Sequence, residues 1–150
     1  MPPSINLWNK FVQYSPQRRW LIAEAALRLL IARLLLSCLP FRRLAAMFSR
    51  TVIEAPLQKN ERERLQEEVV WAIEKAAAHL PGKTVCFPRA IAAQSMLYRR
   101  GISTTMYYGA ASKPEGGLIA HVWLQDGSTG VIGMPEPYTF CVLARFPDAV

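Results

Sequence analysis

The feature that most constrains the fold of this chain is a change in hydrophobic periodicity near Gly101. Before this glycine, apolar residues recur at helical spacing, and the strong helix formers Ala, Leu and Arg are frequent. After it, segments rich in β-branched and aromatic residues alternate with turn residues, which is typical of strands. Helices followed by strands predict an α+β domain.

The predicted helices begin and end at recognisable signals. Pro16 opens the first and Pro40 ends it, while Asn60 fits the N-cap of the third with Glu63 at its third helical position. Cys86 stands immediately before the fourth helix. The predicted helices span residues 16–39, 41–49, 60–80 and 87–100. The charged run 61–68 is expected to be the solvated face of the third helix.

The strand-like segments are separated by residues that favour turns. A Pro/Gly loop lies at residues 112–117, and a DGSTG turn lies at residues 126–130. We expect an antiparallel meander of four strands at residues 102–111, 118–125, 131–133 and 138–146. Cys38 and Cys141 are expected to be small buried hydrophobic residues of a helix and a strand.

Length and composition favour one compact domain over residues 1–150. A chain of 150 residues with 51% hydrophobic content can bury a sizeable core. The three cysteines are scattered, without a CxxC pair or a His/Cys cluster at metal spacing. We therefore expect a cytoplasmic, reducing location, no metal and no cofactor.

Positive charge is concentrated in the N-terminal third of the chain. Residues 1–50 contain eight Lys or Arg and one acidic residue, and residues 51–150 contain ten of each sign. The segment with Cys86 is therefore neutral, which argues against nucleic-acid binding. Residues 1–50 are interpreted as a basic, apolar helical extension of the domain.

The apolar stretch 21–39 has three alternative interpretations. Its length approaches the ~20 residues of a membrane span. However, Glu24 and Arg28 lie on one side of the helix and Arg33 on roughly the opposite side. Charges on two sides favour a buried or partner-packed helix over an interfacial membrane helix, and both over a true span. The helix is also a candidate docking surface for a partner protein, and peripheral membrane contact remains an alternative.

Cys86 and His121 are the candidate catalytic residues. A thiolate at a helix start is favoured by the helix dipole and by unpaired N–H groups. His121 shares a strand face with Trp123, and the imidazole would reach the thiol if that face packs on the Cys86 helix. A Cys-His pair is the minimum apparatus for acyl transfer through a thioester. A buried thiol and a structural histidine explain the same spacing.

Three segments resemble a known family. They are CFPRA at residues 86–90, the helix end LYRRGI at 97–102 and AHVWLQDG at 120–127. Together they resemble the transglutaminase-like cysteine proteases that remove leaders in lasso-peptide biosynthesis, and the similarity covers about residues 60–135. The resemblance implies a transglutaminase/papain-like fold in which the catalytic helix packs on an antiparallel sheet. It implies Cys86 as nucleophile and His121 as base and later acid.

The resemblance also implies a substrate and partners. The substrate would be a ribosomally synthesised precursor peptide, cleaved between leader and core. No segment resembles the winged-helix leader-recognition element that some members carry, so a separate recognition protein is implied, with a separate ATP-dependent cyclase acting afterwards. The alternatives are a transglutaminase-like acyl transferase and a non-catalytic module that binds a membrane or a partner.

The sequence offers more than one candidate for the third member of a catalytic triad. Members of the family often have an Asp about twelve residues after the histidine, and that position here is Gly133. Glu136 and Asp126 are the candidate carboxylates, although Asp126 has the opposite strand parity to His121 and favours a turn. A backbone carbonyl or a water molecule is the other candidate for orienting the imidazole.

Two further residues are candidates for substrate binding. Arg89 would bind an acidic group of the substrate or lie on the helix surface. Trp123, on the face of His121, would belong to the core, shield the Cys-His pair or line the leader pocket.

Overall fold

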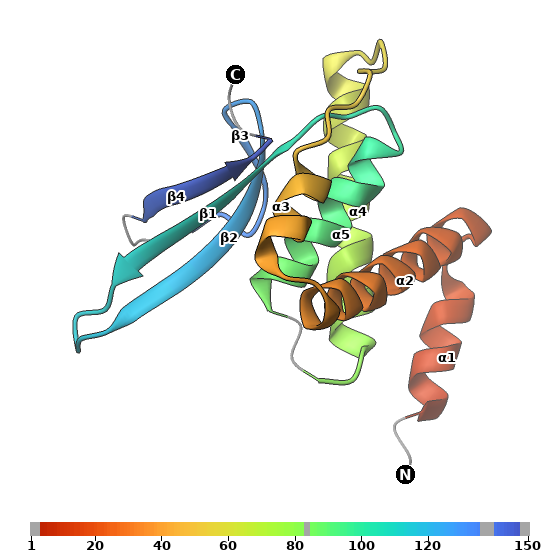
Figure 1. The fold of residues 1–150 in the computed structure, drawn as a ribbon. Helices are drawn as coiled ribbons and strands as arrows, with labels where there is room; N and C mark the ends of the chain where they lie inside the picture. The colour runs from red at the N-terminus through yellow and green to blue at the C-terminus, as the bar shows by residue number, and fades with distance from the viewer. Residues whose placement is uncertain (1–3, 83–84, 136–139, 148–150) are drawn as a thin grey trace.

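The computed structural model describes residues 4–82, 85–135 and 140–147. Within these ranges five helices precede four strands (Figure 1). This order confirms the predicted α+β class. The elements are α1 (Ser4–Gln13), α2 (Pro16–Cys38), α3 (Phe41–Phe48), α4 (Lys59–His79), α5 (Cys86–Tyr98), β1 (Thr105–Ser112), β2 (Leu118–Asp126), β3 (Thr129–Ile132) and β4 (Cys141–Phe146).

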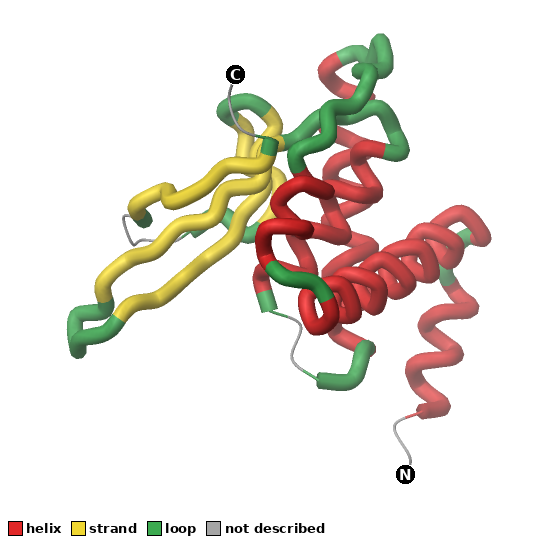
Figure 2. The backbone as a smooth tube through the Cα atoms, in the orientation of Figure 1, coloured by secondary structure: helices red, strands yellow, loops and turns green. Residues whose placement is uncertain are grey.

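Helices and strands occupy separate sides of the molecule, as Figure 2 shows. Helix α5 contacts β2 on one side and α2 and α4 on the other. Helix α2 lies against α4 and α5 on the side away from the sheet (Figure 1). The sheet and α2 are therefore separated by the layer that contains α5.

The sheet is antiparallel but is not a simple meander. Its strand order is β3-β2-β1-β4, so the last strand pairs with β1 rather than with β3. The predicted meander is wrong in this respect. Strand β1 has eight residues whereas β3 has only four, so the edge of β1 that β2 does not occupy offers β4 the longer ladder. Pairing with β1 also places Phe146 opposite Met106 in the core.

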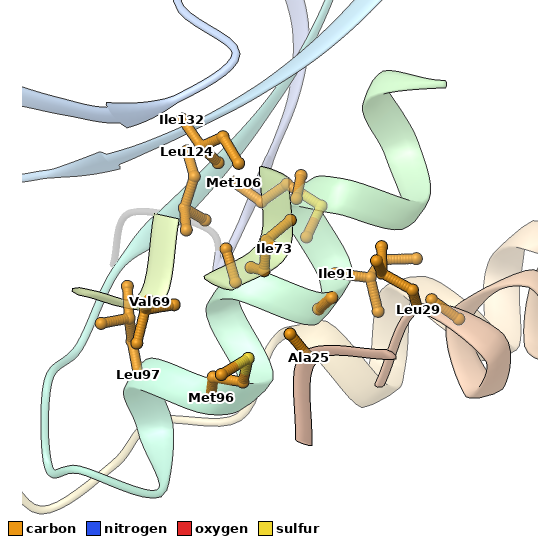
Figure 3. Close-up of a cluster of buried hydrophobic side chains, with 14 of the residues drawn as sticks. Ala25, Leu29, Val69, Ile73, Ile91, Met96, Leu97, Met106, Leu124 and Ile132 are labelled. Carbon is orange, nitrogen blue, oxygen red and sulfur yellow. The ribbon is translucent and has the colours of Figure 1, made fainter. Parts of the chain in front are cut away.

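A single cluster of apolar side chains joins the helices to the sheet. Figure 3 shows side chains from α2, α4 and α5 meeting those of the strands. Members with less than 2% exposure include Leu29, Ile73, Met96, Met106 and Leu124. Burial of side chains of this size stabilises the fold by about 1.5–3 kcal/mol each, so this cluster fixes how the helices pack on the sheet.

The two faces of the sheet have different coverings. On β2, Val122 and Leu124 belong to the core shared with the helices. Because side chains alternate along a strand, His121 and Trp123 lie on the opposite face. There Trp123 is only 5% exposed and stacks on Tyr107, with ring centroids 5.6 Å apart. A second, smaller aromatic cluster thus covers the outer face.

Several helix boundaries agree with the sequence signals and others do not. Pro16 is in the first turn of α2, and the Ser15 hydroxyl accepts a hydrogen bond from the Arg18 N–H at 3.4 Å. Helix α4 begins earlier than predicted, with Gln58 rather than Asn60 at the N-cap. Helix α1 was not predicted, because residues 1–15 mix polar and aromatic side chains without a strong helical signal.

The expected burial of Cys38 and Cys141 is wrong. Both are exposed. Cys38 is the last residue of α2, and Cys141 is the first residue of β4 at the sheet edge. At these positions a residue has fewer neighbours than in the interior of an element, so a small apolar side chain is not forced into the core.

The helices in the described part of the chain do not have the combination of length and apolar character that a bilayer crossing requires. This includes α2, which contains the stretch considered above as a possible span.

A buried carboxylate ties α2 to the end of α5. Arg100 donates a hydrogen bond to Glu24 at 2.8 Å, and Arg99 forms a longer ion pair with it at 3.7 Å. Burial alone would raise the pKa of Glu24. The hydrogen bond from Arg100 and the charges of Arg100, Arg99 and Arg28 outweigh burial and hold the pKa below its ordinary value of 4.5.

We predict that Glu24→Gln lowers the free energy of unfolding at neutral pH by about 2 kcal/mol, because it leaves the partly buried Arg100 without its charged acceptor. Because the pKa of Glu24 is lower in the folded state than in the unfolded state, this stabilisation is fully present above the ordinary carboxyl pKa. It is lost as the pH falls through the pKa of the folded state. The difference between wild type and variant in urea denaturation should therefore shrink in acid. Glu63→Gln, which breaks an exposed pair with Lys59, is the control and should change stability by less than about 0.5 kcal/mol. A constant difference at every pH would contradict the assignment.

We also predict that Leu29→Ala lowers the free energy of unfolding by about 2–5 kcal/mol, because Leu29 is fully buried where α2 meets the core. Leu34→Ala, on the same helix, removes a side chain that is 63% exposed and should have an effect below about 1 kcal/mol. Chemical denaturation of both variants measures the difference. Equal losses would mean that α2 packs through a different face.

Candidate active site

Cys86 is the first residue of α5, one position inside the helix rather than before it. Its N-cap, Val85, makes no side-chain capping hydrogen bond, and Pro88 has no N–H to offer. The N–H groups of Cys86 and Phe87 therefore begin the helix without a side-chain cap. The thiol is half-buried and packs against the edge of the core. A helix N-terminus favours negative charge, so the position suits a thiolate or an oxyanion.

Aromatic rings surround the residue that follows the thiol. Phe87 packs against Phe48 of α3 and Tyr108 of β1, each with centroids 6.5 Å apart. Phe41 also contacts Phe87 and Tyr108. Helix α3 and the strand thus hold the start of α5 from two sides, which fixes the position of Cys86.

His121 is held by a backbone carbonyl. Its Nε2 atom lies 2.5 Å from the carbonyl oxygen of Gly133. Because a carbonyl only accepts hydrogen bonds, Nε2 carries the hydrogen and donates it. In the neutral ring Nδ1 is then left with a free lone pair, which is the state that a general base requires. The ring also contacts Trp123 and Phe140, at centroid distances of 6.2 and 5.5 Å, and these two rings contact each other.

Gly133 is suited to this contact by its backbone. Its φ of +71° is in the left-handed region, and a Cβ there would lie 3.0 Å from the carbonyl oxygen of Val122. An Asp side chain at this position would be strained and crowded. The carbonyl of Gly133 contacts the imidazole from the sequence position at which the family resemblance led us to expect a carboxylate. A backbone carbonyl was one of the alternatives for orienting the ring.

The structure does not bring Cys86 and His121 into contact. Phe87 packs on Tyr108, which pairs with Val122 on the helix-facing side of the sheet. His121 is on the other face with Trp123, so the face that packs on α5 is not the one considered from the sequence. The described hydrogen bonds include none between the thiol and the imidazole.

Asp126 is engaged elsewhere. Its carboxylate accepts hydrogen bonds from Arg62 Nε at 2.5 Å and Nη2 at 2.9 Å, and from Gln66 at 2.5 Å. Arg62 also donates to Glu54, and this hydrogen bond is the main reason that the pKa of Glu54 is lowered. This network fastens the end of β2 to α4. The other candidate carboxylate, Glu136, lies outside the described residues.

Arg89 and Trp123 both have structural partners. Arg89 Nη1 donates to both carboxylate oxygens of Glu74 at 3.1 Å, which links α5 to α4. Trp123 is buried between Tyr107 and His121. Gly109 lies under its ring, since a Cβ at Gly109 would come within 2.9 Å of the indole. Trp123 is therefore the support on which the His121 ring rests.

The sequence did not predict two residues that hold Asp126 in place. Arg62 and Gln66 belong to the charged run that was predicted to be solvated, yet Gln66 is only 8% exposed and both contact Asp126. Their burial follows helical spacing from Val69 and Ile73, and that spacing was the available signal. Among the described residues, no group of three or more His, Cys, Asp or Glu side chains is arranged to hold a metal ion.

The fold and the candidate site define a domain in which a cysteine begins a helix packed on an antiparallel sheet and a histidine lies on the second strand. The sequence pattern of the Transglutaminase-like superfamily matches residues 35–145, and the chain belongs to this superfamily. Domains of this type are typically cysteine proteases or acyltransferases. No curated protein and no solved structure matches the chain.

We predict that the neutral His121 ring is the Nε2–H tautomer, which the ¹⁵N chemical shifts of its two ring nitrogens report directly. Asp126→Asn should leave this tautomer unchanged, because Asp126 contacts Arg62 and Gln66 rather than the imidazole. The same variant should lower the free energy of unfolding by about 1–3 kcal/mol, since it weakens a charged hydrogen-bond pair. A change of tautomer in Asp126→Asn would instead identify Asp126 as the residue that orients His121.

Proposed function

We propose that the protein is a cytoplasmic cysteine peptidase that cleaves the leader from a ribosomally synthesised lasso-precursor peptide. The observation that carries the proposal is the superfamily match over residues 35–145, which contains both Cys86 at the start of α5 and His121 on β2. The finer assignment to lasso-precursor cleavage is supported by the motif resemblance at residues 86–90, 97–102 and 120–127. A separate leader-recognition protein presents the peptide, and an ATP-dependent cyclase acts on the released core.

The reaction proceeds through a thioester on Cys86. His121 Nδ1 takes the thiol proton, and the Cys86 sulfur attacks the carbonyl carbon of the bond between leader and core. The C–N bond breaks as the imidazolium returns the proton to the leaving amine, which frees the core. Water, deprotonated by His121, then attacks the thioester, and the leader leaves with a carboxylate while Cys86 regains its proton.

The start of α5 supports the oxyanion formed in both steps. The N–H groups of Cys86 and Phe87 have no side-chain cap, and they are the candidate donors to the developing negative charge. The helix dipole acts in the same direction. The roles of Arg89 and Trp123 in this proposal are indirect: Arg89 fixes α5 on α4, and Trp123 supports the imidazole.

The mechanism requires His121 to reach the α5 side of β2. Within the described ranges, β3 pairs with residues 124–126 of β2, and no described strand pairs with this edge of β2 at His121. We propose that the imidazole moves past this edge of β2 toward Cys86 when substrate binds. During this movement the ring keeps its hydrogen bond from Nε2–H to the carbonyl oxygen of Gly133. Catalytic hydrogen bonds commonly tighten only in the substrate complex.

Two other functions make different predictions. The superfamily also supports an acyltransferase, in which an amine replaces water in the second step. The absence of a described contact between Cys86 and His121 would also fit a non-catalytic module that binds a partner or a membrane.

We predict that Cys86→Ala abolishes leader cleavage and that His121→Ala lowers its rate by at least about 100-fold, the contribution typical of general acid–base catalysis. The assay mixes the full chain with the precursor peptide encoded beside its gene and the candidate recognition protein, and mass spectrometry follows the products. Cys38→Ala is the matched control, because this thiol is exposed at the end of α2, outside the site, and the variant should cleave at the wild-type rate.

Three results would separate the alternatives. Full cleavage by Cys86→Ala would exclude the thioester mechanism. A new amide formed from an added labelled amine would identify an acyltransferase. A wild-type protein that binds the recognition protein but leaves the precursor intact would favour the non-catalytic module.

A further inference from the structure

Helix α2 carries an apolar stripe on the side that faces solvent. We call this set of residues the outer stripe: Trp20 (76% exposed), Leu27 (57%), Leu30 (47%), Ile31 (39%) and Leu34 (63%). At about 100° per residue these side chains fall within a sector roughly 100° wide. The opposite side of α2 is also apolar, because Ala25, Leu29 and Ala32 are fully buried in the core. A surface helix normally has a polar outer face, whereas the outer face of α2 exposes apolar side chains to solvent.

Three charged residues of α2 are engaged with partners within the molecule. Glu24 is paired with Arg100, and Arg33 donates to the carbonyl oxygen of Pro81 at 2.6 Å. Arg19 donates to the carbonyl oxygen of Tyr14 at 2.8 Å. The stripe from Trp20 to Leu34 is therefore free of charge over about 20 Å of helix.

Exposed basic residues follow α2 in the sequence. Arg42 and Arg43 at the start of α3, and Arg50 after it, are exposed and take part in none of the ion pairs in the described chain. Residues 1–50 carry a net charge of +7, and their one acidic residue, Glu24, is already paired. A second copy of the chain would bring two such segments together, and their repulsion disfavours self-association through α2.

We propose that the outer stripe of α2 docks the protein on an anionic lipid surface. Trp and Leu side chains on one exposed face of a helix are typical of helices that lie in the membrane interface, and the exposed arginines at positions 42, 43 and 50 follow this helix in the sequence. The arginines add attraction to anionic headgroups. Because α2 lies on the side of the molecule away from the sheet, the docked protein keeps the sheet away from the lipid (Figure 1).

We predict that the full-length protein co-sediments with vesicles of phosphatidylcholine and phosphatidylglycerol and not with vesicles of phosphatidylcholine alone. Added salt should weaken the binding, because part of the attraction is between exposed charges. The double variant Leu27→Glu/Leu34→Glu should bind at least about tenfold more weakly, since it places two carboxylates in the interface. Its circular dichroism and melting curve show whether the fold is kept.

Leu118→Glu is the matched control. Leu118 is 76% exposed at the start of β2, on the opposite side of the molecule from α2, so this variant adds a carboxylate outside the stripe. It should bind vesicles nearly as well as the wild type. Cys86→Ala should also bind normally, which separates docking from catalysis.

Other outcomes would overturn the proposal. Failure of the wild type to bind anionic vesicles would remove it, as would an equal loss in Leu118→Glu. A concentration-dependent dimer that Leu27→Glu/Leu34→Glu dissociates, without vesicle binding, would identify a second copy as the occupant. A complex with the leader-recognition protein that the same variant dissociates, without vesicle binding, would identify that protein instead.

Discussion

Alternation along β2 is the constraint on which the candidate site depends. Burying Val122 and Leu124 against the helices fixes the sheet on α5, and it also turns His121 and Trp123 to the other face. A shift of one residue in register would reverse both faces and would expose the core. The packing that holds Cys86 in place therefore also puts the His121 side chain on the other face of the sheet. The proposed mechanism needs the imidazole to reach the α5 side of β2.

The hydrogen bond from His121 to Gly133 determines which tautomer the imidazole adopts, but it does not provide a charge for the imidazolium. A carbonyl can hold the imidazole in the Nε2–H tautomer, but it carries no full charge to stabilise an imidazolium. A carboxylate would supply that charge, and the two carboxylates in question are Asp126, which is occupied by Arg62, and Glu136, which lies outside the described residues. Among the described residues, the carbonyl of Gly133 orients the ring, and in the proposed mechanism the Cys86 thiolate balances the charge of the imidazolium.

The sequence predicted those features that depend on neighbouring residues. Pro16 and Pro40 marked the ends of α2, and the change of periodicity near Gly101 separated helices from strands. The two-residue alternation of side chains along a strand did not show which face of β2 is buried, because both faces carry large apolar side chains. This alternation also did not show that β4 pairs with β1. Nor did it show that Asp126 forms an ion pair with Arg62, 64 residues away. Contacts of this kind depend on how the elements pack, which no local pattern contains.

The most direct test of the central claim is whether the Cys86 sulfur and the His121 imidazole come within reach of each other in solution. In a Cys38→Ser/Cys141→Ser background, Cys86 is the one remaining thiol of the three cysteines. The short bifunctional reagent 1,3-dibromoacetone alkylates that thiol first and then any imidazole close to it. We expect peptide mapping to find a crosslink between Cys86 and His121 that is absent in His121→Ala. Complete alkylation of Cys86 without any crosslink, with and without precursor peptide, would contradict the proposed catalytic pair.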